Sequence, residues 1–323
     1  ELMEEKMKKY FLFTSAALAL IFFSSSTSYP WNGRGHMMVA AVAYNKLTPQ
    51  TKNRVDALLL LNPDRDKWIE ELIPENTSAT KKKMMIFMIA ATWADRIKSD
   101  TDYFTDGTHN GNRPPDDPSA SQNIGYDDLA RHKYWHFEDV PFSQDNTPLP
   151  TVPTPNLRTQ INTFREVLSS DKPDPLKSYD LSWFLHLLGD AHQPLHCTTR
   201  VSLTLPGGDD GGNGVKLNSP GPANLHSFWD GVLGSGNSPL TALNAISTLP
   251  SPPTGAADDL DVSHWMDECF KDAQQTVYKT PIGAGTGPLT LTPAYKTAAL
   301  KLAQKRIAVA GARLAKILNE ELR

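Results

Sequence analysis

The chain has 323 residues, of which 39% are hydrophobic and 21% are charged. This composition is ordinary for a globular protein and is sufficient for a substantial core in one large or two small domains. The formal net charge of -4 argues against a protein that grips nucleic acid through a uniformly basic surface, although bound metal ions would supply positive charge locally.

The N-terminus has the pattern of a secretory signal. A basic stretch at residues 6–9 precedes an apolar run at 10–23 and a region rich in serine and threonine. The apolar run of 14 residues is too short to span a membrane, and no second long run follows it. We therefore expect residues 1–30 to be a signal peptide with an upstream extension at 1–6, and the mature chain 31–323 to be soluble and secreted or periplasmic.

Two cysteines, Cys197 and Cys269, are too few for a disulfide framework. An oxidising compartment would permit one bridge, but nothing in the sequence indicates that these two residues meet. Asn76 begins a single glycosylation sequon, which has meaning only in a eukaryotic secretory pathway.

The first part of the mature chain is predicted to be helical. An apolar helical stretch covers residues 37–47, and a capping threonine followed by proline begins a helix over 48–61. Apolar residues recur at helical spacing over 83–97. Such a methionine-rich stripe is typical of core packing, and Asp95 near its end is the exception that we single out.

The next part is dominated by loops. Residues 99–129 are polar and rich in Gly, Pro, Asn and Asp, and predict a long loop with a functional or mobile role. Residues 134–140 are predicted to be a short extended segment that carries His136. A proline-rich connection at 141–155 then leads to a helix near 156–168.

The stretch from Phe184 to His196 contains three histidines and an aspartate on an otherwise apolar background. His186 and Asp190 are four residues apart, so on a helix they share one face. A proline near the end of the stretch cannot continue the helix, so His196 is expected to turn toward a second centre beside the first. We interpret His192 as a structural residue or one that supports the ligands.

Downstream, residues 207–214 are a glycine-rich turn or loop, and residues 224–230 again place a histidine and an aspartate four apart. A connector at 231–255 and two closing helices at 257–278 and 293–322 complete the chain. We find no repeat and no series of alternating strands, and therefore predict one mainly helical domain with long loops and at most a small β-hairpin.

Eight side chains fit a metal centre by their type and repetition, with Trp31 as a possible ninth ligand: His36, Asp95, His136, His186, Asp190, His196, His226 and Asp230. One buried histidine alone is more often bonded to a backbone carbonyl. Five imidazoles and three carboxylates exceed the needs of one tetrahedral zinc and suit a cluster of two or three ions. His109, His132 and His264 lie outside the repeated patterns and are expected at the surface or in hydrogen bonds.

The order of six motifs resembles the class I, or S-one/P-one, zinc-dependent single-strand nucleases of fungi, plants and some bacteria and protists. They are Trp…His at 31–36, Trp-Ala-Asp at 93–95, Trp-His-Phe at 135–137, His-x-x-x-Asp-x-His-Gln-Pro-Leu-His at 186–196, Asp-x-Gly-Gly-Asn at 209–213 and Asn-Leu-His-x-x-Trp-Asp at 224–230. This resemblance covers essentially the whole mature chain. It implies the single-domain helical fold shared by these nucleases and the zinc-dependent phospholipases C.

The resemblance also implies three zinc ions. Asp95, His136 and His186, with Asp190 as a bridge, would hold the first, and His196, His226 and Asp230 the second. The third would be held by Asp190, His36 and the α-amino nitrogen and carbonyl oxygen of Trp31. Only a free N-terminus supplies that amino ligand, so the mature protein is expected to begin at Trp31. Pro30 departs from the small residue that signal peptidase prefers before the cut.

The implied activity is hydrolysis of single-stranded DNA and RNA to 5′-phosphorylated products, together with 3′-nucleotidase activity. Zinc lowers the pKa of bound water to about 7, which provides the nucleophile. Lys98 stands where the family has arginine, so it keeps the charge but loses the bidentate phosphate contact. The resemblance gives Asp95, Lys98 and Asn213 catalytic roles, and Phe137 and Asp139 roles in base stacking and base-edge recognition. Single-stranded nucleic acid and 3′-nucleotides are the expected partners, and no stable protein partner is implied.

Two other interpretations remain open. A zinc-dependent phospholipase C would share the fold and the metal cluster, but that group usually has glutamate where Asp230 stands. A catalytically silent zinc-binding protein is favoured only by the lysine at position 98.

Overall fold

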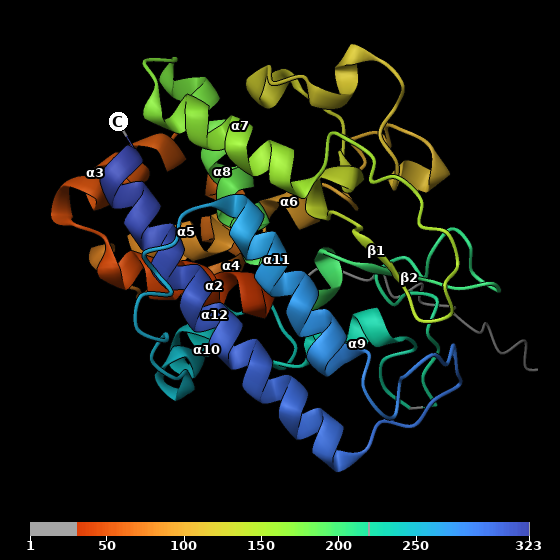
Figure 1. The fold of residues 1–323 in the computed structure, drawn as a ribbon. Helices are drawn as coiled ribbons and strands as arrows, with labels where there is room; N and C mark the ends of the chain where they lie inside the picture. Colours follow the sequence, from red (N-terminus) through yellow and green to blue (C-terminus); the bar gives the residue numbers. More distant parts are fainter. Residues whose placement is uncertain (1–30, 219, 323) are drawn as a thin grey trace, which may run out of the picture.

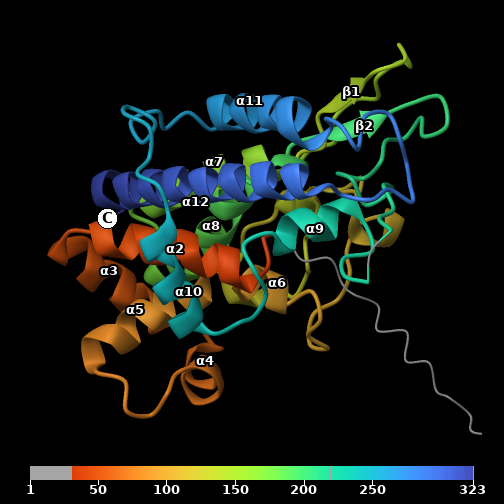
Figure 2. The same ribbon diagram turned by 90° about the horizontal axis from the view of Figure 1, so that it is seen from below.

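The computed structural model describes residues 31–218 and 220–322. Helix α8 (Asp174–Asp190) lies at its centre and is buried from Lys177 to its last residue. Its apolar residues occur on all sides instead of in one stripe, as expected for a helix surrounded by other helices. Helices α2 (Gly33–Lys46) and α12 (Pro293–Glu321) pack side by side across the same core. Figures 1 and 2 show α12 as the long helix that crosses the molecule beside α2.

The close packing of α2 and α12 depends on a glycine. A Cβ atom at Gly311 would lie 2.5 Å from the Cβ of Val42 and 2.9 Å from the carbonyl oxygen of Val39. Only a residue without a side chain therefore lets the two helices approach at this point. This contact holds the beginning of the domain against its last helix.

Shorter helices surround these three. Helix α7 (Leu157–Ser169) packs on α8 and begins with a capping box in which Asn156 and Thr159 bond to each other's backbone N–H groups. The remaining α-helices are α3 (Pro49–Leu59), α4 (Arg65–Leu72), α5 (Ala79–Ala90), α6 (Trp93–Arg96), α9 (Leu225–Gly231), α10 (Pro239–Ala245) and α11 (Val262–Asp272). The prediction of a mainly helical fold is confirmed.

The described residues contain no more sheet than the small hairpin that was allowed for, but the two strands are parallel and do not form a hairpin. Strands β1 (Pro141–Ser143) and β2 (Thr199–Val201) are parallel, with Pro141 opposite Thr199. Helices α7 and α8 lie between these strands in the sequence, and a crossover of this kind joins parallel strands, whereas a tight turn would join antiparallel ones. The sheet thus ties the segment after His136 to the segment after His196.

Several predicted boundaries were wrong. The helix expected over 83–97 is divided into α5 and α6 by a turn, where the Thr92 hydroxyl donates to the Ile89 carbonyl oxygen. Residues 133–136 form a short 3₁₀ helix instead of an extended segment, and the connector 231–255 contains α10. The helix predicted at 257–278 begins only at Val262 and ends in a π-helical turn at 273–277.

The predicted long loop at 99–129 contains short 3₁₀ helices at His109–Gly111, Pro118–Ser121 and Gly125–Asp127. Further 3₁₀ helices lie at Pro194–His196 and Ile246–Thr248. Cys197 and Cys269 form a disulfide that links the end of the stretch from Phe184 to His196 to α11. The predicted signal peptide lies outside the described residues. Within the described part of the chain, none of the helices combines the length and apolar character needed to cross a membrane.

Candidate metal centre

Three groups of buried histidines and aspartates gather at the C-terminal end of α8. Within each group, one potential ligand atom of every member lies within 4.8 Å of the others. The groups are His36, His186 and Asp190; Asp95, His136 and His186; and His196, His226 and Asp230. These are the eight side chains that the sequence motifs selected, and they come from α2, α6, α8, α9 and the 3₁₀ helices before β1 and β2.

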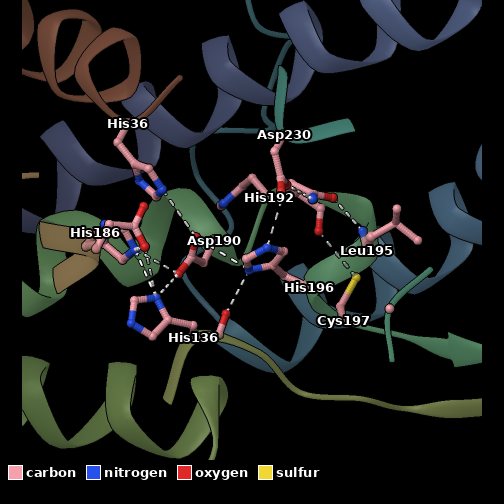
Figure 3. A network of polar contacts seen from close by, with 12 residues as sticks. His36, His136, His186, Asp190, His192, Leu195, His196, Cys197 and Asp230 are labelled. Atoms are coloured by element: carbon pink, nitrogen blue, oxygen red, sulfur yellow. Dashed lines mark hydrogen bonds and ion pairs between the residues drawn. The ribbon is translucent and has the colours of Figure 1, made fainter. Parts of the chain in front are cut away.

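Asp190 lies between the groups (Figure 3). Its Oδ2 atom is 3.1 Å from Nδ1 of His136 and 3.2 Å from Nε2 of His186. Its Oδ1 atom is 3.3 Å from Nε2 of His36 and 3.4 Å from Nδ1 of His196. The two carboxylate oxygens therefore face different histidines, which is the arrangement that a bridging ligand requires.

Backbone carbonyls orient three of the imidazoles. Nδ1 of His186 is 2.8 Å from the Ala91 carbonyl oxygen, and Nδ1 of His226 is 2.8 Å from that of Gly211. Nδ1 of His196 is 2.8 Å from the carbonyl oxygen of His136. An N–H donated to a carbonyl leaves the lone pair of Nε2 available to a metal, so these bonds select the ligating tautomer.

A lysine ammonium lies beside the group of Asp95, His136 and His186. Oδ1 of Asp95 is 3.6 Å from Nε2 of His186 and 3.9 Å from Nδ1 of His136. Nζ of Lys98 donates to the same Asp95 oxygen over 2.9 Å. The predicted catalytic lysine thus lies one helical turn beyond Asp95 and directly beside the centre.

In the group of His196, His226 and Asp230, Nε2 of His226 is 3.5 Å from Oδ2 of Asp230, and Nε2 of His196 is 4.0 Å from Oδ1 of Asp230. Gln193 supports this group, because its side-chain amide donates to Oδ1 of Asp230 over 2.7 Å. Its own oxygen accepts from the backbone N–H of Leu195 over 2.6 Å. Gln193 belongs to the motif at 186–196, but nothing in the sequence indicated that its side chain would orient Asp230.

The first described residues of the chain lie beside the centre. Trp31 is fully buried, and a Cβ atom at Gly35 would lie 2.8 Å from its Cβ atom. The backbone N–H of Asn32 donates to the Asp230 carbonyl oxygen over 3.1 Å. The imidazole of His36 stacks on that of His186 with ring centroids 3.8 Å apart. These contacts place the segment that follows Trp31 beside Asp230 and His186.

Burial sets the protonation of the cluster. It lowers the pKa of His186 and His226 to about 4, and it lowers the pKa of His36, with a further contribution from the charge of His186. The pKa values of His136 and His196 lie well below the usual range for the same main reason. The imidazoles are consequently neutral near pH 7, which is the form that binds metal. Burial also raises the pKa of Asp190 to about 7, and a bound cation would favour its ionised form.

The donor set fits metal ions. Several buried ligand atoms in this region have no hydrogen-bond partner within the described structure: both ring nitrogens of His36, Oδ2 of Asp95, Nε2 of His136, Oδ1 of Asp190 and Nε2 of His196. Buried polar atoms without partners are costly and uncommon in folded proteins. Their gathering at one place is explained if cations complete the site, since nitrogen and carboxylate oxygen are the ligands that zinc prefers.

The centre opens into a pocket of about 760 Å³. Its walls include the metal-group residues His136, His196 and His226, and the predicted substrate residues Phe137, Asp139, Lys98 and Asn213. Burial raises the pKa of Asp139 to about 8, and the charges of Asp210 and Asp209 add to this effect. The side-chain amide of Asn213 donates to the Asp210 carbonyl oxygen over 2.9 Å, so its nitrogen already has a partner.

The remaining histidines lie outside the three metal groups. His192 is buried, with Nδ1 2.8 Å from the Leu188 carbonyl oxygen and Nε2 3.0 Å from a guanidinium nitrogen of Arg313. His132 is also buried and stacks on Trp135, with its ring nitrogens near Asp128 and Asp106. His264 is exposed beside Asp259, and His109 is exposed on the wall of the pocket.

Comparison with known families gives one match over this whole region. The sequence model described as S1/P1 Nuclease matches residues 31–323, which include all three metal groups and the pocket. The same chain has no match among curated proteins.

Proposed function

Because this chain belongs to the S1/P1 nuclease family and is therefore a hydrolytic nuclease, we propose that it is a zinc-dependent endonuclease for single-stranded DNA and RNA. Its products carry a 5′-phosphate, and it also removes phosphate from 3′-nucleotides. The single observation that carries this proposal is the arrangement around Asp190, where three groups of imidazoles and carboxylates lie beside a pocket that is lined by His136, His196 and His226.

Three zinc ions fit these ligands. Asp95, His136, His186 and one oxygen of Asp190 would hold the first ion, and His196, His226 and Asp230 the second. His36, the other oxygen of Asp190 and the N-terminal amino and carbonyl groups of Trp31 would hold the third. When bound, zinc supplies positive charge that polarises a phosphodiester and lowers the pKa of a nucleophilic water to about 7.

The protein supplies orientation and additional charge. Lys98 is held by its ion pair with Asp95, so its ammonium group is positioned to attract a phosphate that approaches the centre. It is a point charge that cannot make the two parallel hydrogen bonds of an arginine. Asn213 lines the pocket wall, and its amide would have to exchange its bond to the Asp210 carbonyl for one to the substrate.

Selection of unpaired nucleic acid follows from the pocket wall. The phenyl ring of Phe137 would stack on a base, and Asp139 would bond to the edge of that base. A base inside a duplex exposes neither face, whereas an unpaired base can enter the pocket. With a pKa of about 8, Asp139 carries a proton near neutral pH and could donate as well as accept.

Export is part of the proposal. The family match begins at Trp31, and the Cys197–Cys269 disulfide is typical of proteins that fold in an oxidising compartment. Removal of the leader before Trp31 would generate the free amino group that the third ion needs.

The test uses protein that begins at Trp31. Release of acid-soluble nucleotides from single-stranded DNA and from RNA is measured with chelator, without chelator and after zinc is restored, and hydrolysis of phosphatidylcholine is measured in parallel. We expect chelator-sensitive nucleotide release that zinc restores, and intact lipid. Lipid hydrolysis alone, or nucleotide release that chelator does not affect, would contradict the proposal.

Two matched variants sharpen this test. Asp190→Asn keeps the shape of the side chain but removes the bridging charge, and we expect activity to fall by about a hundredfold or more together with loss of zinc. Asp258→Asn is the control, since Asp258 is exposed and pairs with Lys316 at the surface. Equal activity in the two variants would show that Asp190 has no role at the centre.

A further inference from the structure

A small hairpin in the long loop forms part of the pocket wall. Thr108 and Arg113 exchange two backbone hydrogen bonds, N–H to O over 2.9 Å and 3.1 Å. The turn between them needs left-handed backbone at three consecutive residues, with φ of 52° at His109, 59° at Asn110 and 86° at Gly111. The tip hairpin, residues 108–113, therefore has a specific shape that places His109, Asn112 and Arg113 on the pocket wall.

The tip hairpin is fastened to the residues just before His136. Nζ of Lys133 donates to the Asn110 carbonyl oxygen over 3.1 Å. Asp106, which precedes the hairpin, accepts from the backbone N–H of His132 over 2.8 Å and from the Tyr134 hydroxyl over 2.6 Å. Because Tyr134 is buried, these bonds hold the hairpin at a defined distance from the metal centre.

Three cations line the same pocket: Lys98, Arg113 and Lys133, which we call the basic wall. Lys98 forms an ion pair with Asp95. Lys133 instead donates to a backbone carbonyl oxygen, and this neutral acceptor does not cancel its positive charge. Burial and the positive charges of Arg131 and Lys98 lower the pKa of Lys133. Arg113 is exposed, and its charge acts on Asp139, the predicted base-edge residue.

These three cations and the carboxylates of Asp139 and Asp210 line the same pocket, in a chain whose net charge is -4. Solvated surface lysines and arginines need no partner, but these residues line a concave pocket that leads to a centre for phosphodiesters. The proposed centre takes the phosphate that is cleaved, and Phe137 and Asp139 take one base. Arg113 and Lys133 also lie on the pocket wall and have no part in either of these contacts, so they are available to another charged group of the substrate.

We propose that Arg113 and Lys133 bind the phosphate of a nucleotide that flanks the cleaved bond, so that the enzyme favours polynucleotide chains over mononucleotides. This inference rests on the proposed function and names a second contact for its substrate. A mononucleotide has a single phosphate, which the metal centre occupies, and gains nothing from this subsite. A chain of two or more nucleotides gains one charge-assisted hydrogen bond for each phosphate that reaches it.

The experiment measures binding and does not depend on catalysis. A fluorescently labelled single-stranded oligonucleotide with phosphorodithioate linkages, which keep the negative charge and resist hydrolysis, is titrated with zinc-loaded protein, and anisotropy gives the dissociation constant at several salt concentrations. The variants are Arg113→Gln, Lys133→Gln and the double variant, and Lys301→Gln on an exposed part of α12 is the matched control. Competition with a 3′-mononucleotide gives its affinity in the same buffer.

We expect each neutral variant to weaken oligonucleotide binding about threefold or more at low salt. The slope of log affinity against log salt should fall by about 0.7 for each phosphate that the variant no longer binds. The decrease in affinity should be severalfold larger for the oligonucleotide than for the mononucleotide. Arg113→Lys retains the charge and should retain most of the slope, which separates charge from folding of the hairpin.

Equal slopes in the double variant and in Lys301→Gln would overturn this inference, and so would equal decreases in affinity for the two ligands. A wild-type protein that does not bind the oligonucleotide would overturn it as well. The proposed function fails by a different result, namely lack of hydrolysis by zinc-loaded protein, so the two failures are distinguishable.

Discussion

Removal of the Cys197–Cys269 disulfide tests how the centre is stabilised. The bridge closes a segment with a sequence separation of 72 residues. The loop-entropy relation for a cross-link of this span predicts a loss of about 4 kcal/mol in the free energy of unfolding when both cysteines are replaced by serine. Carbonyl oxygens lie 3.2 Å from each sulfur atom, that of Pro194 at Cys197 and that of Gln193 at Cys269, so the new hydroxyls have acceptors and add little further cost.

With an unfolding entropy of about 2.1 cal/mol/K per residue, this loss lowers the melting temperature by roughly 7 °C. Circular dichroism of the wild type and of the double serine variant, both with chelator, measures the change without a contribution from metal. The reduced wild-type protein is the control and should melt with the variant. A difference below about 2 °C would refute the argument that the cross-link acts by restricting the unfolded chain.

The bridge also has a local consequence for the centre. Cys197 directly follows His196, and the bridge fixes the end of that 3₁₀ helix to α11. Without it, the group of His196, His226 and Asp230 should bind zinc less tightly, while the group of Asp95, His136 and His186 should change less. Competition with a chromogenic chelator measures this difference as one ion that is released earlier than the others.

Further predictions concern the ligands and a buried acid. Gly189→Ala would place a Cβ atom 2.7 Å from Nδ1 of His36 and should displace this imidazole. We expect the variant to lose one zinc ion by elemental analysis and most of its activity in the nuclease assay. Gly231→Ala is the control, because its Cβ would meet nothing within 4 Å, and it should change neither the zinc content nor the activity. Burial raises the pKa of Asp180 from 3.8 to about 8. The folded protein therefore holds a proton on Asp180 that the unfolded chain has lost, so the free energy of unfolding is highest below pH 4 and falls as the pH rises to about 8. Chemical denaturation should therefore show that Asp180→Asn removes a decline of about 1.4 kcal/mol per pH unit in that range, and parallel profiles would contradict this. One extra residue before Trp31 should leave two zinc ions per chain by elemental analysis, and an unchanged count would exclude the amino ligand.

Local spacing predicted part of the candidate centre. The four-residue intervals from His186 to Asp190 and from His226 to Asp230 follow directly from helix geometry, and both members of each pair face the centre. The mainly helical fold was predictable from hydrophobic periodicity for the same reason. The metal groups themselves were assembled from the motifs, and the structure brings those residues together.

What could not be predicted depends on contacts between distant segments. The meeting of Cys197 with Cys269, the parallel pairing of β1 with β2 and the bond from His186 to the Ala91 carbonyl each require the folded core. The break between α5 and α6 contains no glycine or proline that would predict it from the sequence. It nevertheless places the Ala91 carbonyl oxygen where it contacts His186. Arg113 and Lys133 belong to no motif, so their place on the pocket wall was also invisible in the sequence.

The most direct test of the account is the metal content of protein that begins at Trp31. Elemental analysis after removal of loosely bound ions, made alongside the nuclease assay, should give three zinc ions per chain and activity that rises with zinc occupancy. Full nuclease activity in protein with less than one bound metal ion per chain would contradict the account, because the three groups around Asp190 would then have no part in the reaction.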